Sequence, residues 1–285
     1  MANIIVAQPH GFCFGINRAI ALARQTAQKF HQPIFFLGEL VHNQHVVSWL
    51  EHDLNIKTVT DINQISPNSI VIIRAHGAAP QVFRRLRSRG LTLVDASCPL
   101  VLKSHQTVRR LASAKKSIIF LCNKIDHDET VGVVGEAPKF VTPVTLDNIY
   151  QHSISHPDQT VVITQTTLST TETKAALDYL KNKYPGITIL PHICQATTNR
   201  QQSIIKLTKK YHFVIIVGSP TSANSNSLRQ VAESAGATAY IVDNPTELKP
   251  EWFQNIDNIV VSSGASTPED ILLSVIDQIK DFTRP

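Results

Sequence analysis

Long apolar runs are missing from this sequence of 285 residues, although hydrophobic residues make up 42% of it. No run reaches the roughly 18 residues that a membrane span requires, so we expect no membrane association. The N-terminal segment MANIIVAQ lacks both a basic region and a small-residue cleavage site, and it predicts an early strand rather than an export signal. These absences favour a cytoplasmic protein with a sizeable core.

Aromatic residues are also scarce, at 6% of the sequence, while the net charge is +5. With few rings on which bases could stack, we expect no nucleic-acid binding. The densest basic cluster, Arg84, Arg85, Arg87 and Arg89, is interpreted as the solvated face of one helix. The positive charge instead suits an anionic small substrate or an acidic protein partner.

Closely spaced cysteines are absent as well. The sequence has four cysteines at wide spacing, which do not form a disulfide framework in a chain of this size and favour a reducing compartment. Cys122 lies inside the apolar run SIIFLC and is expected in the core. Each of the other three, Cys13, Cys98 and Cys194, follows an apolar run and precedes a helical stretch. Intervals of 85 and 96 residues separate them, and 91 residues follow the last, so they divide the chain into near-thirds.

Short β-branched runs alternate with longer amphipathic stretches, which is typical of parallel α/β layers. We predict helices at residues 16–29, from 42, at 80–88, 99–114, in the segment after Cys122, and at 170–183, 196–210 and 268–281. The predicted strands are 3–7, 34–37, 56–59, 70–73, 91–94, 118–122, 140–144, 160–163, 187–190, 213–217, 238–241 and 258–261.

The third round of this alternation lacks its last strand, and the unassigned strand 3–7 leads into Cys13. We therefore expect the N-terminal strand to complete the third sheet. The predicted fold is three similar small parallel-sheet α/β domains in a pseudo-threefold trefoil around one centre. Their expected boundaries are 14–97, 98–193, and 194–285 together with 1–13.

Polar loops follow the first and third strands of each predicted domain: GELVHNQH, NKIDHDET and GSPTSANSN, then RAHGAAP, TQTTLST and SSGASTP. In parallel sheets, ligands bind at the carboxyl ends of the strands, where these loops and the three cysteines are expected. Imidazole, hydroxyl and amide groups suit a phosphate or diphosphate, and the candidates are His42, His76, His127, Ser222, Asn224 and Ser266. Glu129 is the candidate acid or base, Thr166 a candidate for orienting substrate, and Asp95 is expected to brace the turn before Cys98.

Two metal centres are open for three thiolates: zinc completed by His, or an iron–sulfur cluster. The paired cysteines of common zinc sites and the runs of ferredoxins are both missing. One ligand from each domain suits a cluster on the pseudo-threefold axis, with one of four irons left without a protein ligand. Each cysteine precedes a helix start, where the dipole favours a thiolate and an anionic cluster.

The motifs GFCFGINRAI, LVHNQHVV, DASCPLVLKSH, TQTTLS and ICQATTNRQ, with HDETVG, SANSN and GAS-x-P, resemble the IspH/LytB family of 4-hydroxy-3-methylbut-2-enyl diphosphate reductases, from about Gly11 to Ile279. The resemblance implies a [4Fe–4S] cluster on Cys13, Cys98 and Cys194 with one open iron. It implies a diphosphate site at His42, His76, His127, Ser222, Asn224 and Ser266, Glu129 as proton donor, and a substrate-positioning role for Thr166. The implied reaction is the last step of the methylerythritol phosphate route to isoprenoids.

The sequence departs from the family pattern at two places. The family usually has H-P-E where this chain has His127, Asp128 and Glu129, and Asp126 adds a second flanking acid. Ala223 stands where the family usually has a serine, and the missing hydroxyl costs on the order of 1 kcal/mol of diphosphate binding. We expect an acidic electron donor such as ferredoxin or flavodoxin, and a monomer or homodimer. The alternatives are a non-catalytic iron–sulfur sensor or scaffold and a zinc-binding module.

Overall fold

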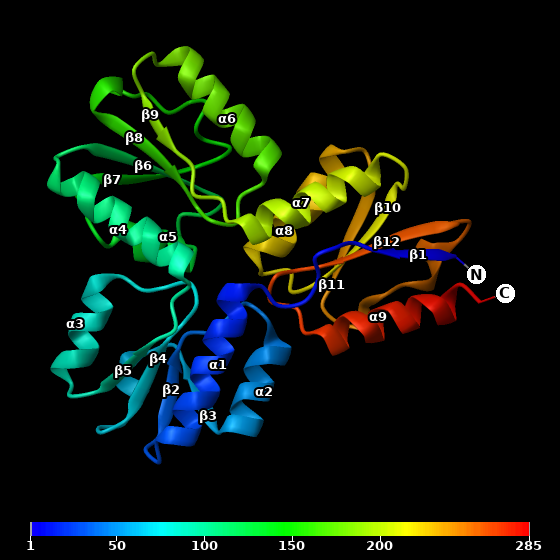
Figure 1. Ribbon diagram of the computed structural model, residues 1–285, viewed down its shortest axis with the longest axis horizontal. Helices are drawn as coiled ribbons and strands as arrows, with labels where there is room; N and C mark the ends of the chain where they lie inside the picture. Colours follow the sequence, from blue (N-terminus) through cyan, green and yellow to red (C-terminus); the bar gives the residue numbers. More distant parts are fainter. Residues whose placement is uncertain (1, 285) are drawn as a thin grey trace. The chain divides into compact units, whose positions relative to one another are not determined.

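The computed structural model describes residues 2–284, and within this range the strand pairs form three four-stranded sheets, all of them parallel (Figure 1). The α/β class predicted from the sequence is confirmed. In the first two sheets the second strand along the chain lies at one edge, followed by the first, the third and the fourth. The third sheet has the same order when the N-terminal strand is counted as its last strand. The repetition inferred from the cysteine spacing is therefore a repetition of topology.

The first sheet has the order β3-β2-β4-β5. Its strands are β2 (Ile34–Leu37), β3 (Ile56–Val59), β4 (Ile70–Ile73) and β5 (Thr92–Asp95), and the associated helices are α1 (Phe14–Lys29), α2 (Gln44–Leu54) and α3 (Pro80–Ser88). All four residues of β4 are buried, as expected for a central parallel strand that is covered on both faces.

The second sheet has the order β7-β6-β8-β9. Its strands are β6 (Ser117–Cys122), β7 (Val141–Thr145), β8 (Thr160–Thr164) and β9 (Thr188–Leu190), with helices α4 (Pro99–Ser113), α5 (Asp128–Val134) and α6 (Thr170–Lys183). Alternate residues of β6 pack into different cores: Phe120 lies in a cluster with Val108 of α4, and Leu121 in one with Leu180 of α6. Because successive side chains of a strand point to opposite faces of the sheet, β6 contributes to the cores on both faces.

The third sheet has the order β1-β12-β10-β11. Its strands are β10 (Phe213–Val217), β11 (Thr238–Val242), β12 (Asn258–Ser263) and β1 (Asn3–Val6), with helices α7 (Gln195–Thr208), α8 (Ala223–Ser234) and α9 (Glu269–Phe282). Strand β1 pairs in parallel with β12, with Asn3 opposite Asn258. The prediction that the N-terminal strand completes the third sheet is confirmed.

Helix α8 is the element that the sequence did not predict. The segment was interpreted as a loop, but Ser222 is the N-cap of a 12-residue helix, its side chain accepting a hydrogen bond from the backbone of Ser225. The buried face of the first turns consists of Asn and Ser rather than apolar residues, so the apolar periodicity emerges only from Leu228 onwards. Ser and Asn are also weak helix formers, because their side chains compete for backbone hydrogen bonds.

The contacts divide the described chain into two compact units. Residues 2–14, 42–46 and 194–284 form one, here called the third-sheet unit, and residues 15–41 and 47–193 form the other, the two-sheet unit. Short 3-10 turns occur at Ile62–Gln64, Pro157–Gln159, Pro245–Glu247 and Pro250–Phe253. Among the described residues, every helix is too short or too polar to cross a membrane.

Candidate active site

The three widely spaced cysteines all stand at the start of a helix. Cys98 is the N-cap of α4, Cys194 is the N-cap of α7, and Cys13 directly precedes α1. All three are of intermediate burial, and none of them forms a disulfide with another described cysteine. The positive end of the helix dipole stabilises a thiolate at such a position, which is the form that binds metals.

Cys122 differs from these three, as predicted. It is fully buried in β6, and its Sγ lies 3.5 Å from the carbonyl oxygen of Val144. Burial raises the pKa of the Cys122 thiol to about 11, so it stays protonated at neutral pH. The prediction that Cys122 belongs to the core is confirmed.

In the two-sheet unit, Glu129 and Thr166 meet at the carboxyl ends of β6 and β8. Glu129 Oε1 accepts a hydrogen bond of 2.9 Å from the Thr166 backbone N–H, and Oε2 accepts one of 2.8 Å from Thr166 Oγ1. The residue is 1% exposed. It was expected in a loop, but it lies in the first turn of α5, where the side chain of His127 caps its backbone N–H at 3.1 Å.

Burial decides the protonation of Glu129. Loss of solvation raises the pKa of its carboxyl from 4.5 to about 7, although the two Thr166 hydrogen bonds and the charge of His105 act in the opposite direction. A carboxyl group with this pKa is close to half protonated at neutral pH, which is the condition for a general acid. The two Thr166 donors would also keep the carboxyl oriented.

His127 is held in one tautomer by its neighbours. Its Nδ1 accepts from the Glu129 backbone at 3.1 Å and lies 3.3 Å from Nε2 of Gln165. Gln165 uses its Oε1 to accept from the backbone of Asn123 at 3.0 Å, so its amide nitrogen is the atom that faces the imidazole. This network leaves the proton on Nε2 of His127, as a donor suited to a phosphate oxygen. The ring of His76 packs edge-on against it, with centroids 5.6 Å apart.

Gln165 was not singled out from the sequence, although it directly precedes Thr166 in the TQTT motif.

Asp128, the acid that directly follows His127, forms an ion pair of 2.5 Å with Arg74. The added negative charge at this position is therefore compensated within the two-sheet unit. Gly38 provides the space for Arg74, since a side chain at this residue, whose φ is +75°, would collide with the guanidinium.

In the third-sheet unit, a chain of hydrogen bonds links Cys194 to Asn224. Cys194 Sγ lies 3.1 Å from Thr197 Oγ1, which donates to Asn224 Oδ1 at 3.4 Å. The amide oxygen of Asn224 is thereby used, and its Nδ2 is buried without a partner among the described residues. Ser222 and Ser266 are likewise buried at the carboxyl edge of the third sheet, each 5% exposed.

Glycines allow these polar groups to approach the strand ends closely. A side chain at Gly218 or Gly264 would collide with the hydroxyl of Ser225, in the first turn of α8. Gly218 is the residue that follows the first strand of its sheet, the same place that Gly38 has in the first sheet. The loops after the first strands of the first and third sheets thus share a steric requirement for glycine.

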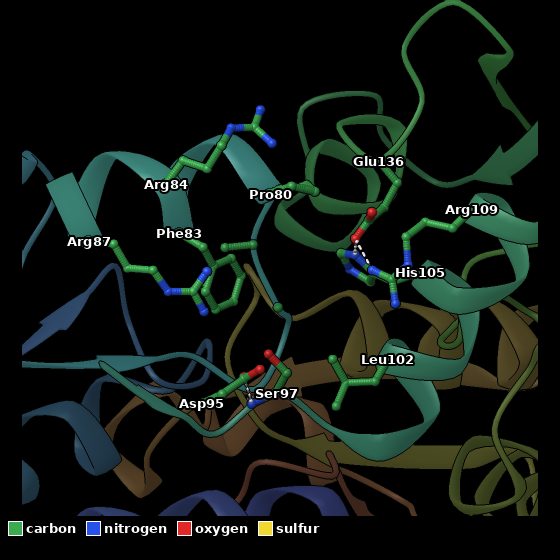
Figure 2. Close-up of a pocket in the computed structure, with 12 residues that line it drawn as sticks. Pro80, Phe83, Arg84, Arg87, Asp95, Ser97, Leu102, His105, Arg109 and Glu136 are labelled. Atoms are coloured by element: carbon green, nitrogen blue, oxygen red, sulfur yellow. Dashed lines mark hydrogen bonds and ion pairs between the residues drawn. The ribbon is translucent and has the colours of Figure 1, made fainter. Parts of the chain in front are cut away.

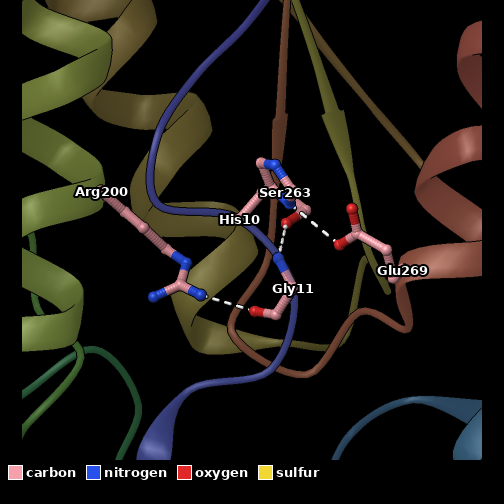
Figure 3. Close-up of polar contacts among 5 residues, drawn as sticks. All are labelled: His10, Gly11, Arg200, Ser263 and Glu269. Carbon is pink, nitrogen blue, oxygen red and sulfur yellow. Dashed lines mark hydrogen bonds and ion pairs between the residues drawn. The ribbon is translucent and has the colours of Figure 1, made fainter.

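Arg200 on α7 is a buried cation beside two of the cysteines and was not found from the sequence. It is 2% exposed and donates to the carbonyl oxygen of Gly11, as Figure 3 shows, while Gly11 N–H donates to Ser263 Oγ at 2.9 Å. Burial lowers the pKa of Arg200, and the charges of Cys13 and Cys194 act to raise it. The ICQATTNRQ motif indicates that an arginine lies on this helix, but its contact with Gly11 depends on the fold.

The donor set fits an iron–sulfur cluster. Partly exposed thiols at helix starts supply the soft ligands that such clusters require. Nε of Arg200 is buried without a partner among residues 2–284. A guanidinium with an open donor therefore lies where it would compensate the charge of an anionic group.

Of the other predicted residues, His42 belongs to the third-sheet unit, and His76 and His127 belong to the two-sheet unit.

Comparison with known proteins gives a consistent result. A family model described as "LytB protein" matches residues 4–280. The 4-hydroxy-3-methylbut-2-enyl diphosphate reductase of Shewanella halifaxensis (strain HAW-EB4) is 38% identical over 283 residues, covering 97% of this chain and 91% of that protein. The enzyme of the same name from Chlamydia muridarum (strain MoPn / Nigg) is also 38% identical, covering 98% and 91%.

Solved structures agree. The E-1-hydroxy-2-methyl-but-2-enyl-4-diphosphate reductase of Plasmodium falciparum is 31% identical, with a TM-score of 0.92 over 97% of this chain and 87% of that one. A second structure, described as (E)-4-hydroxy-3-methyl-but-2-enyl diphosphate reductase, the terminal enzyme of the non-mevalonate pathway, is 28% identical with a TM-score of 0.67, covering 99% and 100%.

Proposed function

The chain belongs to the LytB family, and on this premise we propose that it is a reductase of 4-hydroxy-3-methylbut-2-enyl diphosphate. The allylic C–O bond breaks, two electrons and two protons are consumed, and the products are water and isopentenyl or dimethylallyl diphosphate. This is the terminal step of the non-mevalonate route to isoprenoids. The observation that carries the proposal is the buried carboxyl of Glu129, bonded to Thr166 and with a pKa of about 7.

The cofactor in this proposal is one [4Fe–4S] cluster held by Cys13, Cys98 and Cys194. When bound, such a cluster supplies single electrons and one open iron that acts as a Lewis acid. The supporting features are the position of the three thiols at helix starts and the open donor of the buried Arg200. The protein's own residues then have to bind the diphosphate, orient the alcohol and deliver a proton.

Glu129 is proposed as the proton donor. Protonated Glu129 can donate to Thr166 Oγ1 through the 2.8 Å contact, and the Thr166 hydroxyl can pass its own proton to the leaving hydroxyl group, which departs as water. Thr166 therefore both orients substrate and relays the proton. A positioned general acid of matched pKa accounts for roughly 10²–10⁴-fold of a rate enhancement.

The diphosphate is assigned to six polar side chains: His42, His76, His127, Ser222, Asn224 and Ser266. The unpartnered Nδ2 of Asn224 supports the assignment, because it leaves a donor for a phosphate oxygen. The tautomer of His127, with its proton on Nε2, has the donor character that a phosphate oxygen requires. Ser222 stands at the N-terminus of α8, where backbone N–H groups and the helix dipole favour an anion. Ala223 supplies no hydroxyl, so we expect binding about fivefold weaker than with serine at this position.

Several broader features belong to the same proposal. An acidic protein such as ferredoxin or flavodoxin would supply the electrons, and the net charge of +5 supports this pairing. The widely spaced cysteines suit the reducing cytoplasm. The division into domains 14–97, 98–193 and 194–285 with 1–13 is supported by the repeated strand order in the three sheets.

The decisive test is anaerobic turnover with reduced methyl viologen as electron source, together with iron analysis. We expect product formation by the wild type, and loss of iron when Cys13, Cys98 or Cys194 is replaced by Ser. Cys122→Ala is the matched control and should keep its iron, because this thiol is buried in β6. A cluster without product would favour the sensor or scaffold, and zinc in place of iron would favour the zinc module.

A further inference from the structure

The segment from Pro80 to Ser113, which spans α3, β5 and α4, concentrates the positive charge of the protein. It holds seven Lys and Arg residues against one Asp, a net charge of +6, compared with +5 for the whole chain. The remaining residues together therefore have a net charge close to zero. Cys98, the proposed cluster ligand, lies inside this segment as the N-cap of α4.

A cavity of about 320 Å³ is lined by residues of α3 and α4 (Figure 2). Arg84 and Arg87 project from α3 and Arg109 from α4, and the lining extends to Ser97. Ser97 directly precedes Cys98 in the chain. The cavity therefore extends from an arginine-rich surface to the residue that precedes a proposed cluster ligand.

The two α3 arginines are available for a partner. Arg84 and Arg87 are exposed, and no carboxylate within the described part of the chain forms an ion pair with either. Arg87 lies over the ring of Phe83, 5.9 Å from its centroid. By contrast, Arg89 on the same segment is used within the fold, donating to the carbonyl oxygens of Ile62 and Ile65.

The acids of the lining are already engaged. Asp95 Oδ1 accepts from the Ser97 backbone at 3.0 Å, which confirms its predicted bracing role, and Glu136 accepts from His105 and Arg109. Two buried polar atoms, Ser97 Oγ and His105 Nε2, have no hydrogen-bond partner among residues 2–284. Both atoms are buried, so it is the positive charge of the exposed Arg84 and Arg87 that suits an incoming carboxylate.

We propose that the α3–α4 cavity is the docking site for an acidic one-electron carrier protein, with Arg84 and Arg87 as its principal contacts. The inference rests on the proposed function, since only a reductase with a cluster needs such a carrier. An apolar centre of Phe83 and Leu102 with a rim of arginines is typical of a protein interface. The wall at Ser97 places the docked carrier next to the Cys98 ligand.

Electrostatics gives this site its expected kinetic signature. Electron-transfer complexes are small and transient, so affinity from buried area is limited. Complementary charge accelerates their association by about 10-fold to 10³-fold, and the acceleration falls steeply with ionic strength. Loss of the arginines should therefore act on the association rate rather than on the chemistry at the cluster.

The experiment measures cluster reduction by stopped-flow bleaching in the anaerobic, substrate-free protein. A plant-type [2Fe–2S] ferredoxin, reduced and then freed of reductant, is the acidic carrier, and reduced methyl viologen is the small-molecule reference. Reduced methyl viologen is a radical monocation and is not attracted to an arginine-lined cavity. For Arg84→Gln/Arg87→Gln we expect the second-order rate constant with ferredoxin to fall about tenfold at low ionic strength.

The matched control is Lys209→Gln/Lys210→Gln. It also removes two exposed cations, at the far end of α7, a helix that likewise starts at a proposed cluster ligand. Its rate with ferredoxin should stay within about twofold of the wild type. The salt dependence should be steep for the wild type and this control, and flatter for Arg84→Gln/Arg87→Gln.

Equal losses in both double variants, or no loss in either, would overturn the docking site. So would a parallel loss of reduction by methyl viologen, because the defect would then lie at the cluster. Since the readout is cluster reduction, it does not depend on the proposed reaction. A cluster that ferredoxin reduces but that forms no product with substrate would overturn the reductase proposal and leave the docking result standing.

Discussion

Two glutamates lie at opposite ends of α5 and are both withdrawn from solvent, yet their pKa values move in opposite directions. Glu129 in the first turn is 1% exposed, and burial raises its pKa to about 7. The side chain of Glu136, just past the last turn, is 4% exposed, but its pKa is lowered. Burial alone therefore does not determine which carboxyl keeps its proton.

The difference lies in the charge of the partners. Glu136 Oε1 lies 2.7 Å from His105 Nδ1 and 3.0 Å from Arg109 Nη1, and these contacts outweigh the effect of burial. The two oxygens of Glu129 instead receive hydrogen bonds from the backbone N–H and the hydroxyl of Thr166, both of them neutral groups. A structural ion pair and the proposed proton donor are thus only seven residues apart.

The largest expected effect comes from removing the proposed proton donor. Glu129→Gln keeps an oxygen that can accept from the Thr166 backbone but carries no transferable proton, so we expect turnover with methyl viologen to fall at least about 100-fold. Iron content and visible spectrum should be unchanged. Turnover is to be measured by product formation over a range of pH.

Glu136→Gln is the matched control for this variant, because it makes the same chemical change at the other end of α5. It should keep turnover within a few-fold of the wild type. If both variants lost activity equally, the assignment of the proton donor to Glu129 would fail. The wild-type rate should also decline above about pH 7, where Glu129 loses its proton.

The second effect concerns stability. Glu136→Ala leaves His105 buried without its anionic partner, and breaking such a pair costs about 3 kcal/mol. We expect the thermal midpoint of the anaerobic protein to fall by about 6 °C. A midpoint shift of less than about 1 °C would contradict a structural role for this ion pair.

The pH dependence of this stabilisation has a definite sign. Because the folded-state pKa of Glu136 is lowered, its contribution is complete above the unfolded value of 4.5 and is lost as the pH falls through the folded-state value. The difference in midpoint between wild type and Glu136→Ala should therefore shrink under acid conditions. Glu129→Gln should show the opposite trend, because a raised pKa disfavours the folded state as the pH rises towards 7.

Much of the fold follows from the sequence because parallel strands are nearly continuous apolar runs. The predicted ranges 34–37, 56–59 and 70–73 coincide with β2, β3 and β4. Helix α8 was missed because its buried first turns carry Asn224, Ser225 and Ser227, polar residues that break the apolar period. Because these buried residues are polar, the apolar period that reveals a helix in a sequence is absent from this segment.

The site was predicted by residue type and position at strand ends, and that reasoning has a physical limit. Thr166 and Glu129 could be proposed separately, but their two hydrogen bonds depend on the pairing of β6 with β8. Arg200 and Gln165 act through contacts with Gly11 and His127, which lie far away in sequence. The spacing of residues in the sequence does not reveal side chains whose only role is to position other groups.

His105 tests whether the two ends of α5 are coupled, and it has the smallest expected effect. It contacts Glu136 directly, and its positive charge also lowers the pKa of Glu129, so His105→Gln should raise that pKa above about 7. The shift should be at most about one unit. Because the acid must be protonated to react, the decline of the turnover rate at high pH should move to higher pH by the same amount.

Arg109→Gln is the control that makes this result specific. Arg109 also contacts Glu136, but its side chain is 54% exposed and its charge is not among the influences on the pKa of Glu129. With methyl viologen as reductant, the pH profile of Arg109→Gln should coincide with that of the wild type. If the pH profile of turnover moved equally in His105→Gln and Arg109→Gln, Glu136 itself would transmit the effect to Glu129. The two carboxyls would then belong to one network rather than to two separate sites.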